Sequence, residues 1–214
     1  MRLLQQTGAV RMRDVAVSFQ GEVNETNERA AGTLSEGSDH PLALRGANVC
    51  LYAVREASQG EEVHVNVERF LRGKGRETKA YAFEHERVGF QRSSPQNNFR
   101  RIIAARILRG AFCLDTVSYV TDASCKIDLD LLLALLNSKI LDWYFRLGST
   151  NSKVNEYQFD ALPVPELIER QERAPLRRPL GVNDLREALA IADADIRHNW
   201  QSYKARFLGK RRRR

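Results

Sequence analysis

The chain has 214 residues, 43% of them hydrophobic, which suits one domain with an appendage or two small domains around a real core. Its three cysteines form no C-x-x-C pair, which argues against a disulfide framework and a cysteine zinc site and fits a reducing cytosol. No apolar run is long and uncharged enough for a signal peptide or a membrane span, so we expect a cytoplasmic protein without a membrane partner.

The net charge of +7 is unevenly distributed along the sequence. Residues 69–109 carry 11 basic and three acidic side chains, whereas residues 1–68 carry six basic and ten acidic ones. The basic tail, residues 210–214, is of a kind that is usually solvated and disordered. In the central block the arginines are mixed with apolar and amide residues. That block is either a phosphate-binding surface or an ordinary strand pair with a solvated arginine face.

Short strands and loops are predicted for the first 120 residues. Alternating or continuous apolar residues predict strands over 14–20, 49–54, 63–67, 87–91, 101–107 and 112–120. Polar, glycine-rich or proline-containing segments predict irregular connections over 21–27, 72–79 and 93–98. This order of elements indicates a sheet built from strands that are joined by polar loops.

The pattern changes to helical spacing at Asp128, which is a favourable N-cap. Apolar residues three or four positions apart predict a helix over 129–147, and Gly148 is a natural stop. A second apolar stripe predicts an amphipathic helix that begins at the Asn183 cap. That stripe packs either against the body of the chain or against a partner, as in a coiled coil.

Motifs for catalysis are missing from the sequence. Its six prolines are never adjacent, so it lacks the Asn/Asp-Pro-Pro-Tyr/Phe loop that adenine-N6 methylation requires, and no glycine-rich loop suits S-adenosylmethionine. Glu77 and Lys79 have the E-x-K spacing of metal-dependent nucleases, but no aspartate on a nearby upstream strand completes that site. The four histidines are scattered without ligand spacing.

Three stretches, in conserved order over residues 14–168, carry a family resemblance. They comprise residues 21–27, 41–46 and 49–54; then 87–92, 100–105 and 112–119; then 135–145, 149–155 and 162–165. The third is the most specific, with L-L-N-S-K-I-L-D-W-Y-F followed by S-T-N-S-K-V-N and L-P-V-P. Together they resemble the TaqI-like C-terminal specificity domain of adenine-N6 DNA methyltransferases and type IIG restriction-modification enzymes.

The resemblance implies an α+β fold in which a mixed, curved β-sheet packs against helices, as in a target-recognition domain. We expect that domain over residues 1–168, a linker over 169–182, the amphipathic helix over 183–209 and the basic tail over 210–214. The family domain normally follows a methyltransferase domain in the same polypeptide. The chain is therefore expected to be a separate specificity subunit, a split-gene product or a truncated remnant.

The resemblance also implies that the chain recognises a DNA sequence in a methylation or restriction-modification system. Double-stranded DNA and a methyltransferase or restriction subunit are the expected partners, and S-adenosylmethionine would bind that partner rather than this chain. The expected DNA-binding residues are Arg92, Asn97, Asn98, Arg100, Arg101, Ser149, Thr150, Asn151, Lys153 and Asn155. Asn137 and Ser138 have two interpretations, internal hydrogen bonding or DNA contact.

Two alternatives to DNA recognition remain open from the sequence. In the first, the chain is a protein-interaction module that docks a partner through its C-terminal helix. In the second, it is a metal-dependent nuclease that uses Glu77 and Lys79. Whether the chain is itself part of an enzyme stays uncertain at this level.

Overall fold

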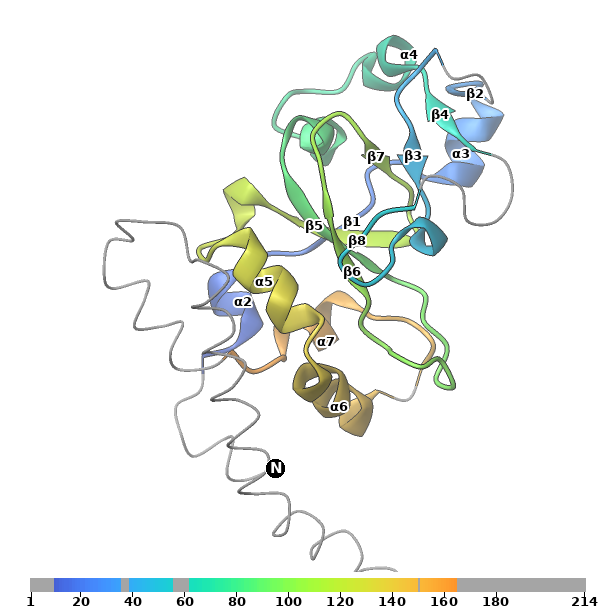
Figure 1. Cartoon of the computed structure of the whole chain (residues 1–214). Coiled ribbons are helices and arrows are strands. Elements are labelled where there is room, and N and C mark those ends of the chain that lie inside the picture. The colour runs from blue at the N-terminus through green and yellow to red at the C-terminus, as the bar shows by residue number, and fades with distance from the viewer. Residues whose placement is uncertain (1–9, 36–38, 56–61, 150, 165–214) are drawn as a thin grey trace, which may run out of the picture. The chain divides into compact units, whose positions relative to one another are not determined.

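The computed structural model describes residues 10–35, 39–55, 62–149 and 151–164 (Figure 1). These residues all belong to the unit Met1–Ala174. The expected linker, amphipathic helix and basic tail lie outside the described residues. Among the helices that are described, none is long and apolar enough to cross a membrane.

Four strands form the central sheet of the described part. They are β1 (Phe19–Gln20), β5 (Arg87–Gln91), β6 (Ala104–Ile107) and β8 (Val117–Thr121). Their order is β1-β8-β5-β6, and every neighbouring pair is antiparallel. On the inner strand β5, Gly89 lies opposite Ala105 and Tyr119. A Cβ atom on Gly89 would come within 2.2 Å of Ile107 Cδ1, so a larger residue here would force the end of that side chain to shift.

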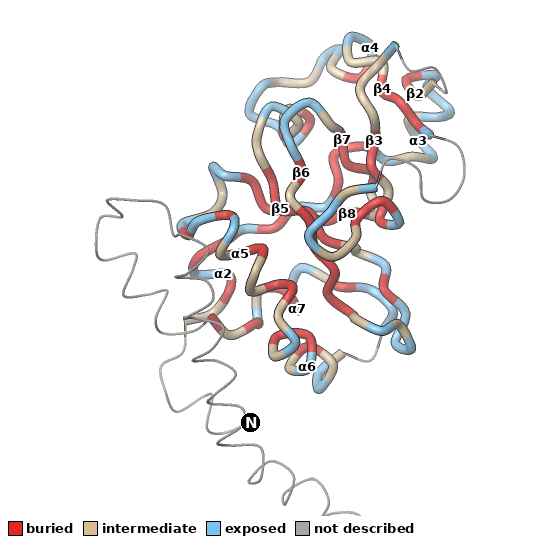
Figure 2. Tube along the Cα trace, viewed as in Figure 1, coloured by how far each residue is buried: buried red, intermediate tan, exposed pale blue. Residues whose placement is uncertain are grey.

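Helices pack against one face of this sheet and bury the larger hydrophobic core. They are α2 (Met12–Val15), α5 (Leu129–Leu136), α6 (Lys139–Gly148) and α7 (Glu156–Asp160). α5 contacts β5 and β6, and α2 contacts α7. Phe90 of β5 stacks on Phe159 of α7 with ring centroids 5.2 Å apart. Figure 2 shows the buried segments concentrated where these elements meet.

A second group of short elements has its own core. It contains α3 (Glu25–Ala30), β2 (Leu34–Ser35), β3 (Ala43–Leu44), β4 (His64–Val65), α4 (Val67–Leu71) and β7 (Phe112–Cys113). Three 3-10 helices complete the described elements: η1 (Gly46–Asn48), η2 (Lys79–Glu84) and η3 (Asp122–Ser124). β2 and β4 pair antiparallel, whereas β3 and β7 pair parallel. The ring of Phe112 lies 5.5 Å from that of Phe70 and 4.5 Å from that of Phe83.

An entirely buried ion pair links β5 to this second group. Arg87 Nη1 donates to Glu22 Oε1 at 3.0 Å, and both side chains have no exposed surface. The same carboxylate oxygen accepts the backbone amide of Cys113 at 3.0 Å. Burial raises the pKa of Glu22, although the positive charge of Arg87 acts in the opposite direction. The desolvation of both charges offsets much of their mutual attraction, so such a pair adds little net stability.

The expected α+β class is confirmed, but the described strands form three separate sheets instead of one mixed sheet. The prediction of a strand over 49–54 is wrong. Only Val49 and Val54 bridge each other, and Tyr52 between them has a φ of 63°, which turns the chain back. The prediction over 14–20 is correct only at its end, where β1 lies. The connection expected over 21–27 contains the start of α3, which Asn24 caps.

The helix expected over 129–147 begins as predicted at the Asp128 cap but divides into α5 and α6. Asn137 leaves the helical path because its side chain bonds to β6. Its Oδ1 accepts the amide of Ala104 at 2.9 Å, and its Nδ2 donates to the carbonyl of the same residue at 2.8 Å. Ser138 then caps α6 by accepting the amide of Leu141 at 3.1 Å. Both residues therefore make internal hydrogen bonds.

Candidate nucleic-acid interface

Two polar segments that are distant in the sequence lie side by side beyond the end of β5. Ser93 and Lys153 form an antiparallel bridge. The amide of Val154 donates to the carbonyl of Arg92 at 2.8 Å, and the amide of Ser94 donates to the carbonyl of Ser152 at 2.8 Å. The segments 92–101 and 149–155 thus form one continuous edge, and neither contains an acidic residue.

The turn over 49–54 lies at the same end of the β5–β6 pair. Gln91 Nε2 donates to the carbonyl of Val49 at 2.8 Å, and the amide of Tyr52 donates to the carbonyl of Ala104 at 2.9 Å. Tyr52 is 56% exposed and is the single non-glycine residue with positive φ in the described ranges. A bulky residue in this conformation is strained, and such strain concentrates at functional positions. No sequence pattern indicates this turn, because the neighbours of Tyr52 follow a strand pattern.

The connection between β5 and β6 is held by two residues one turn apart on α6. Asp142 Oδ1 accepts the backbone amides of Arg101 at 2.6 Å and Ile102 at 2.9 Å. Arg146 Nη2 donates to the carbonyl of Asn98 at 2.9 Å, and its Nε donates to Asp142 Oδ2 at the same distance. The i, i+4 spacing of these two residues was visible in the sequence, but their target was not.

Two of the arginines expected to bind phosphate are engaged inside the protein. Arg100 Nη2 donates to the carbonyls of Asn137 at 2.6 Å and Ser138 at 2.7 Å, where α5 ends and α6 begins. Arg101 is 1% exposed, and its Nη2 donates to the carbonyl of Asn151 at 2.6 Å. Burial, together with the neighbouring charge of Arg146, lowers the pKa of Arg101. These two guanidinium groups shape the loops around them.

Arg92 and Lys153 differ from these two arginines. Lys153 is exposed and Arg92 is partly exposed, and neither side chain makes a hydrogen bond or ion pair with any other residue in the described ranges. They sit on adjacent rungs of the paired segments, since Arg92 faces Val154 and Ser93 faces Lys153. The edge therefore presents two uncompensated positive charges to solvent.

The remaining expected residues surround this pair of cations. Asn97 and Asn151 are exposed, and Asn98 is partly exposed. Ser149 follows α6, and its hydroxyl accepts from Arg101 Nη2 at 3.2 Å. Asn155 precedes α7, and its backbone amide donates to Gln158 Oε1 at 3.1 Å. Thr150 lies outside the described residues.

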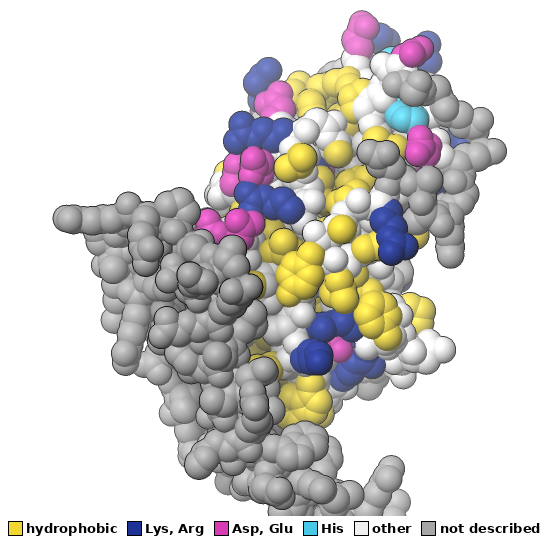
Figure 3. Space-filling view, viewed as in Figure 1, with side chains coloured by type: hydrophobic (Ala, Val, Ile, Leu, Met, Phe, Trp, Pro, Cys, Tyr) yellow, Lys and Arg dark blue, Asp and Glu magenta, His cyan; other side chains and the backbone are white. Residues whose placement is uncertain are grey.

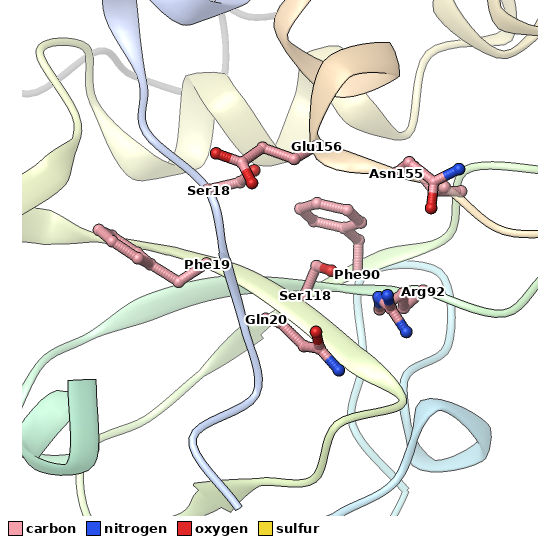
Figure 4. Close-up of a pocket in the computed structure, with 9 residues that line it drawn as sticks. Ser18, Phe19, Gln20, Phe90, Arg92, Ser118, Asn155 and Glu156 are labelled. Carbon is pink, nitrogen blue, oxygen red and sulfur yellow. The ribbon is translucent and has the colours of Figure 1, made fainter. Parts of the chain in front are cut away.

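A small hollow of about 80 Å³ opens beside Arg92 (Figure 4). Its floor is the ring of Phe90, with Arg92 and Asn155 on one side and Ser18 and Glu156 on the other. Gln20, Phe19, Ser118 and Val154 complete its lining. The hollow mixes both signs of charge with hydroxyl and amide groups, so it suits a polar group rather than an apolar one.

Figure 3 shows Lys and Arg side chains beside hydrophobic ones on the face over α6 and the β5–β6 connection, with little acidic surface among them. Elsewhere in the cationic block, two arginines that follow or lie on β6 have acidic partners. Arg106 pairs with Asp130 at 2.7 Å and with Glu86, and Arg109 lies 3.5 Å from Asp122. Part of the positive charge of the block is therefore compensated, whereas Arg92 in the paired segments has no ion-pair partner among the described residues.

The nuclease alternative receives no geometric support. Lys79 Nζ points to the carbonyls of Gln20 and Gly21, at 3.4 Å and 3.3 Å, rather than toward Glu77. Over the part of the chain that the structure describes, no three His, Cys, Asp or Glu side chains gather in a way that could hold a metal ion.

No protein-family model and no curated protein matches the sequence. Among solved structures, the chain is similar to the type IIL restriction-modification enzyme MmeI in complex with DNA, with 12% sequence identity and a TM-score of 0.37. The match covers 90% of this chain and 27% of that one, so the chain spans about a quarter of that enzyme's length. A TM-score of this size does not establish a shared fold.

Proposed function

We propose that the chain is the sequence-recognition module of an adenine-N6 DNA methyltransferase or restriction-modification system. The observation that carries the proposal is the edge formed by segments 92–101 and 149–155. That edge contains no carboxylate, exposes several amide groups and holds Arg92 and Lys153 without an ion-pair partner among the described residues. Duplex DNA offers closely spaced phosphates and base edges, which such a surface complements.

Within this proposal the residues divide into three roles. Arg92 and Lys153 contact phosphates and set the position of the chain on the duplex. Asn97, Asn98 and Asn151 are the candidates for reading base edges, because an amide both donates and accepts. Arg100 and Arg101 are positioning residues that hold the loops through backbone carbonyls. Ser149 and Asn155 complete the described part of the edge, and Thr150, which lies outside the described residues, stays a proposed DNA contact.

Catalysis is supplied by another domain or subunit in this proposal. The ordered resemblance to adenine-N6 methyltransferase specificity domains supports that division, as does the lack of an Asn/Asp-Pro-Pro motif in the sequence. S-adenosylmethionine would bind to that catalytic partner. The chain would contribute the DNA sequence preference, and the partner would contribute the methyl transfer.

The test is binding of the full chain to a fluorescent, random-sequence DNA duplex over a series of salt concentrations. Removing both cations with Arg92→Ala and Lys153→Ala is expected to reduce the slope of log K against log salt by about 1.8, because each phosphate contact contributes about 0.9. Arg72→Ala is the matched control, since Arg72 is an exposed arginine at the end of α4, in the other group of elements.

Three outcomes decide the proposal. Loss of slope in the double variant with no change in Arg72→Ala supports it. Equal losses of slope per removed charge in the two variants would indicate diffuse attraction to any positive surface and would contradict the assigned edge. No binding at low salt, with or without a methyltransferase partner, would favour a protein-interaction module instead.

A further inference from the structure

Phe99 is the most exposed large hydrophobic residue in the described part of the chain. Its exposed fraction is 72%, compared with 68% for Leu108 and 66% for Tyr157. Single exposed hydrophobic residues are ordinary on protein surfaces, so exposure alone implies nothing. The position of Phe99 is what distinguishes it, because it lies on segment 92–101 between Asn98 and Arg100.

The backbone on both sides of Phe99 is fixed by bonds from α6 and from the junction before it. On one side, the carbonyl of Asn98 accepts from Arg146 Nη2 at 2.9 Å, and the Asn98 amide closes a turn onto the carbonyl of Pro95 at 3.0 Å. On the other, Arg100 is bonded to the carbonyls before α6, and the Arg101 amide is bonded to Asp142. The phenyl ring is therefore presented on a preorganised loop, which lowers the entropic cost of using it in binding.

The surroundings of the ring indicate what it would contact. Its neighbours along segment 92–101 are amides, hydroxyls and arginines, and the segment contains no carboxylate. A hydrophobic protein partner requires a contiguous apolar patch, which this segment does not provide. A nucleobase has a flat apolar face and a polar edge beside a phosphate, and an aromatic ring amid amides and cations complements all three.

We propose that Phe99 stacks on a base of the bound duplex by inserting at a base step. This inference rests on the proposed function and adds to it a residue that neither makes a polar contact nor reads a base edge. The loop contacts of Arg146 and Asp142 would keep the ring in place while Arg92 and Lys153 hold the backbone of the DNA.

Photocrosslinking tests this contact directly. The full chain is bound at low salt to a random-sequence duplex in which thymine is replaced by 5-iodouracil, and the crosslinked peptide is identified by mass spectrometry after irradiation. We expect the crosslink at Phe99. Phe99→Ala should abolish it and weaken binding by about 5- to 150-fold, the range for loss of one stacked base. Phe99→Trp should restore both.

Leu108→Ala is the matched control, because Leu108 is nearly as exposed as Phe99 but follows the opposite end of β6. That variant should bind and crosslink like the unmodified chain. A crosslink that maps elsewhere, or Phe99→Ala binding with unchanged affinity, would overturn the stacking inference while leaving DNA recognition intact. If the unmodified chain fails to bind the duplex at all, the proposed function itself fails, so the two failures are distinguishable.

Discussion

The carboxylate of Asp142 accepts the backbone amide of Arg101 at 2.6 Å, across 41 residues of sequence. This bond ties the first turn of α6 to the end of the β5–β6 connection, and the same oxygen also accepts the backbone amide of Ile102. Asp142 is 7% exposed. An acidic residue is thus used inside a basic region to organise the backbone of the candidate DNA-binding loop.

Replacing Asp142 by alanine should destabilise the fold and loosen this loop. Two buried backbone amides would lose their acceptor, and each costs about 1–3 kcal/mol, so the free energy of unfolding should fall by about 2–6 kcal/mol. Urea unfolding measures the loss. Asp142→Asn keeps one acceptor oxygen and should lose less. Equal losses in the two variants would show that the ion pair with Arg146, rather than the amide bonds, carries the stability.

Asn137→Ala should also lower the free energy of unfolding, because it leaves the backbone amide of Ala104 without an acceptor and removes one of the two donors to its carbonyl, which keeps only Tyr52. Asn137 is 4% exposed, so water cannot replace these bonds easily, and we expect a loss of about 2–4 kcal/mol. Ser138→Ala is the neighbouring control. It removes only the cap of α6 and should cost about 1 kcal/mol. A smaller loss for Asn137→Ala than for Ser138→Ala would contradict this prediction.

The buried pair of Glu22 and Arg87 should respond differently to single and double substitution. Either Glu22→Leu or Arg87→Met alone leaves an uncompensated buried charge and should cost about 3–5 kcal/mol. The double variant replaces both charges with apolar groups and should be far more stable than the sum of the two losses implies. Thermal or urea unfolding of all three variants closes the double-mutant cycle, and additive losses would argue against direct coupling.

Acidic pH should remove the contribution of the Glu25–Arg45 ion pair to the free energy of unfolding. Hydrogen bonding by Arg45 lowers the pKa of Glu25 below its ordinary value of 4.5, and the two side chains are 2.6 Å apart. A carboxyl group whose pKa is lowered by folding stabilises the fold at pH values above 4.5, where it is ionised. This stabilisation is lost as the pH falls through the folded-state pKa and the carboxylate is protonated. Because the pair is partly exposed, its contribution should be below about 1 kcal/mol.

The measurement compares the free energies of unfolding of the unmodified chain and Glu25→Gln from neutral pH downward. The difference should be constant near neutrality and should shrink below pH 4.5. A difference that grows as the pH falls would have the wrong sign for a stabilising ion pair.

Local patterns in the sequence predicted the elements whose burial is regular. The alternation around β5 and the helical spacing after Asp128 depend only on neighbouring residues, and both elements lie where they were expected. The break at Asn137 was not predicted, because its cause is a pair of hydrogen bonds to Ala104, 33 residues away. The turn at Tyr52 was not predicted for a similar reason, since its backbone amide donates to the carbonyl of Ala104, which is also distant in the sequence.

By itself the sequence determined the α+β class, the basic middle of the chain, the missing methylation motif and the polar character of residues 92–101 and 149–155. The tertiary structure alone decided that these two segments pair and that the side chains of Arg100 and Arg101 bond to backbone carbonyls of the protein. It also decided that the side chains of Arg92 and Lys153 have no hydrogen-bond or ion-pair partner among the described residues. The physical reason is that a guanidinium group is equally able to bind a phosphate or a backbone carbonyl, and only the folded chain determines which acceptor is within reach.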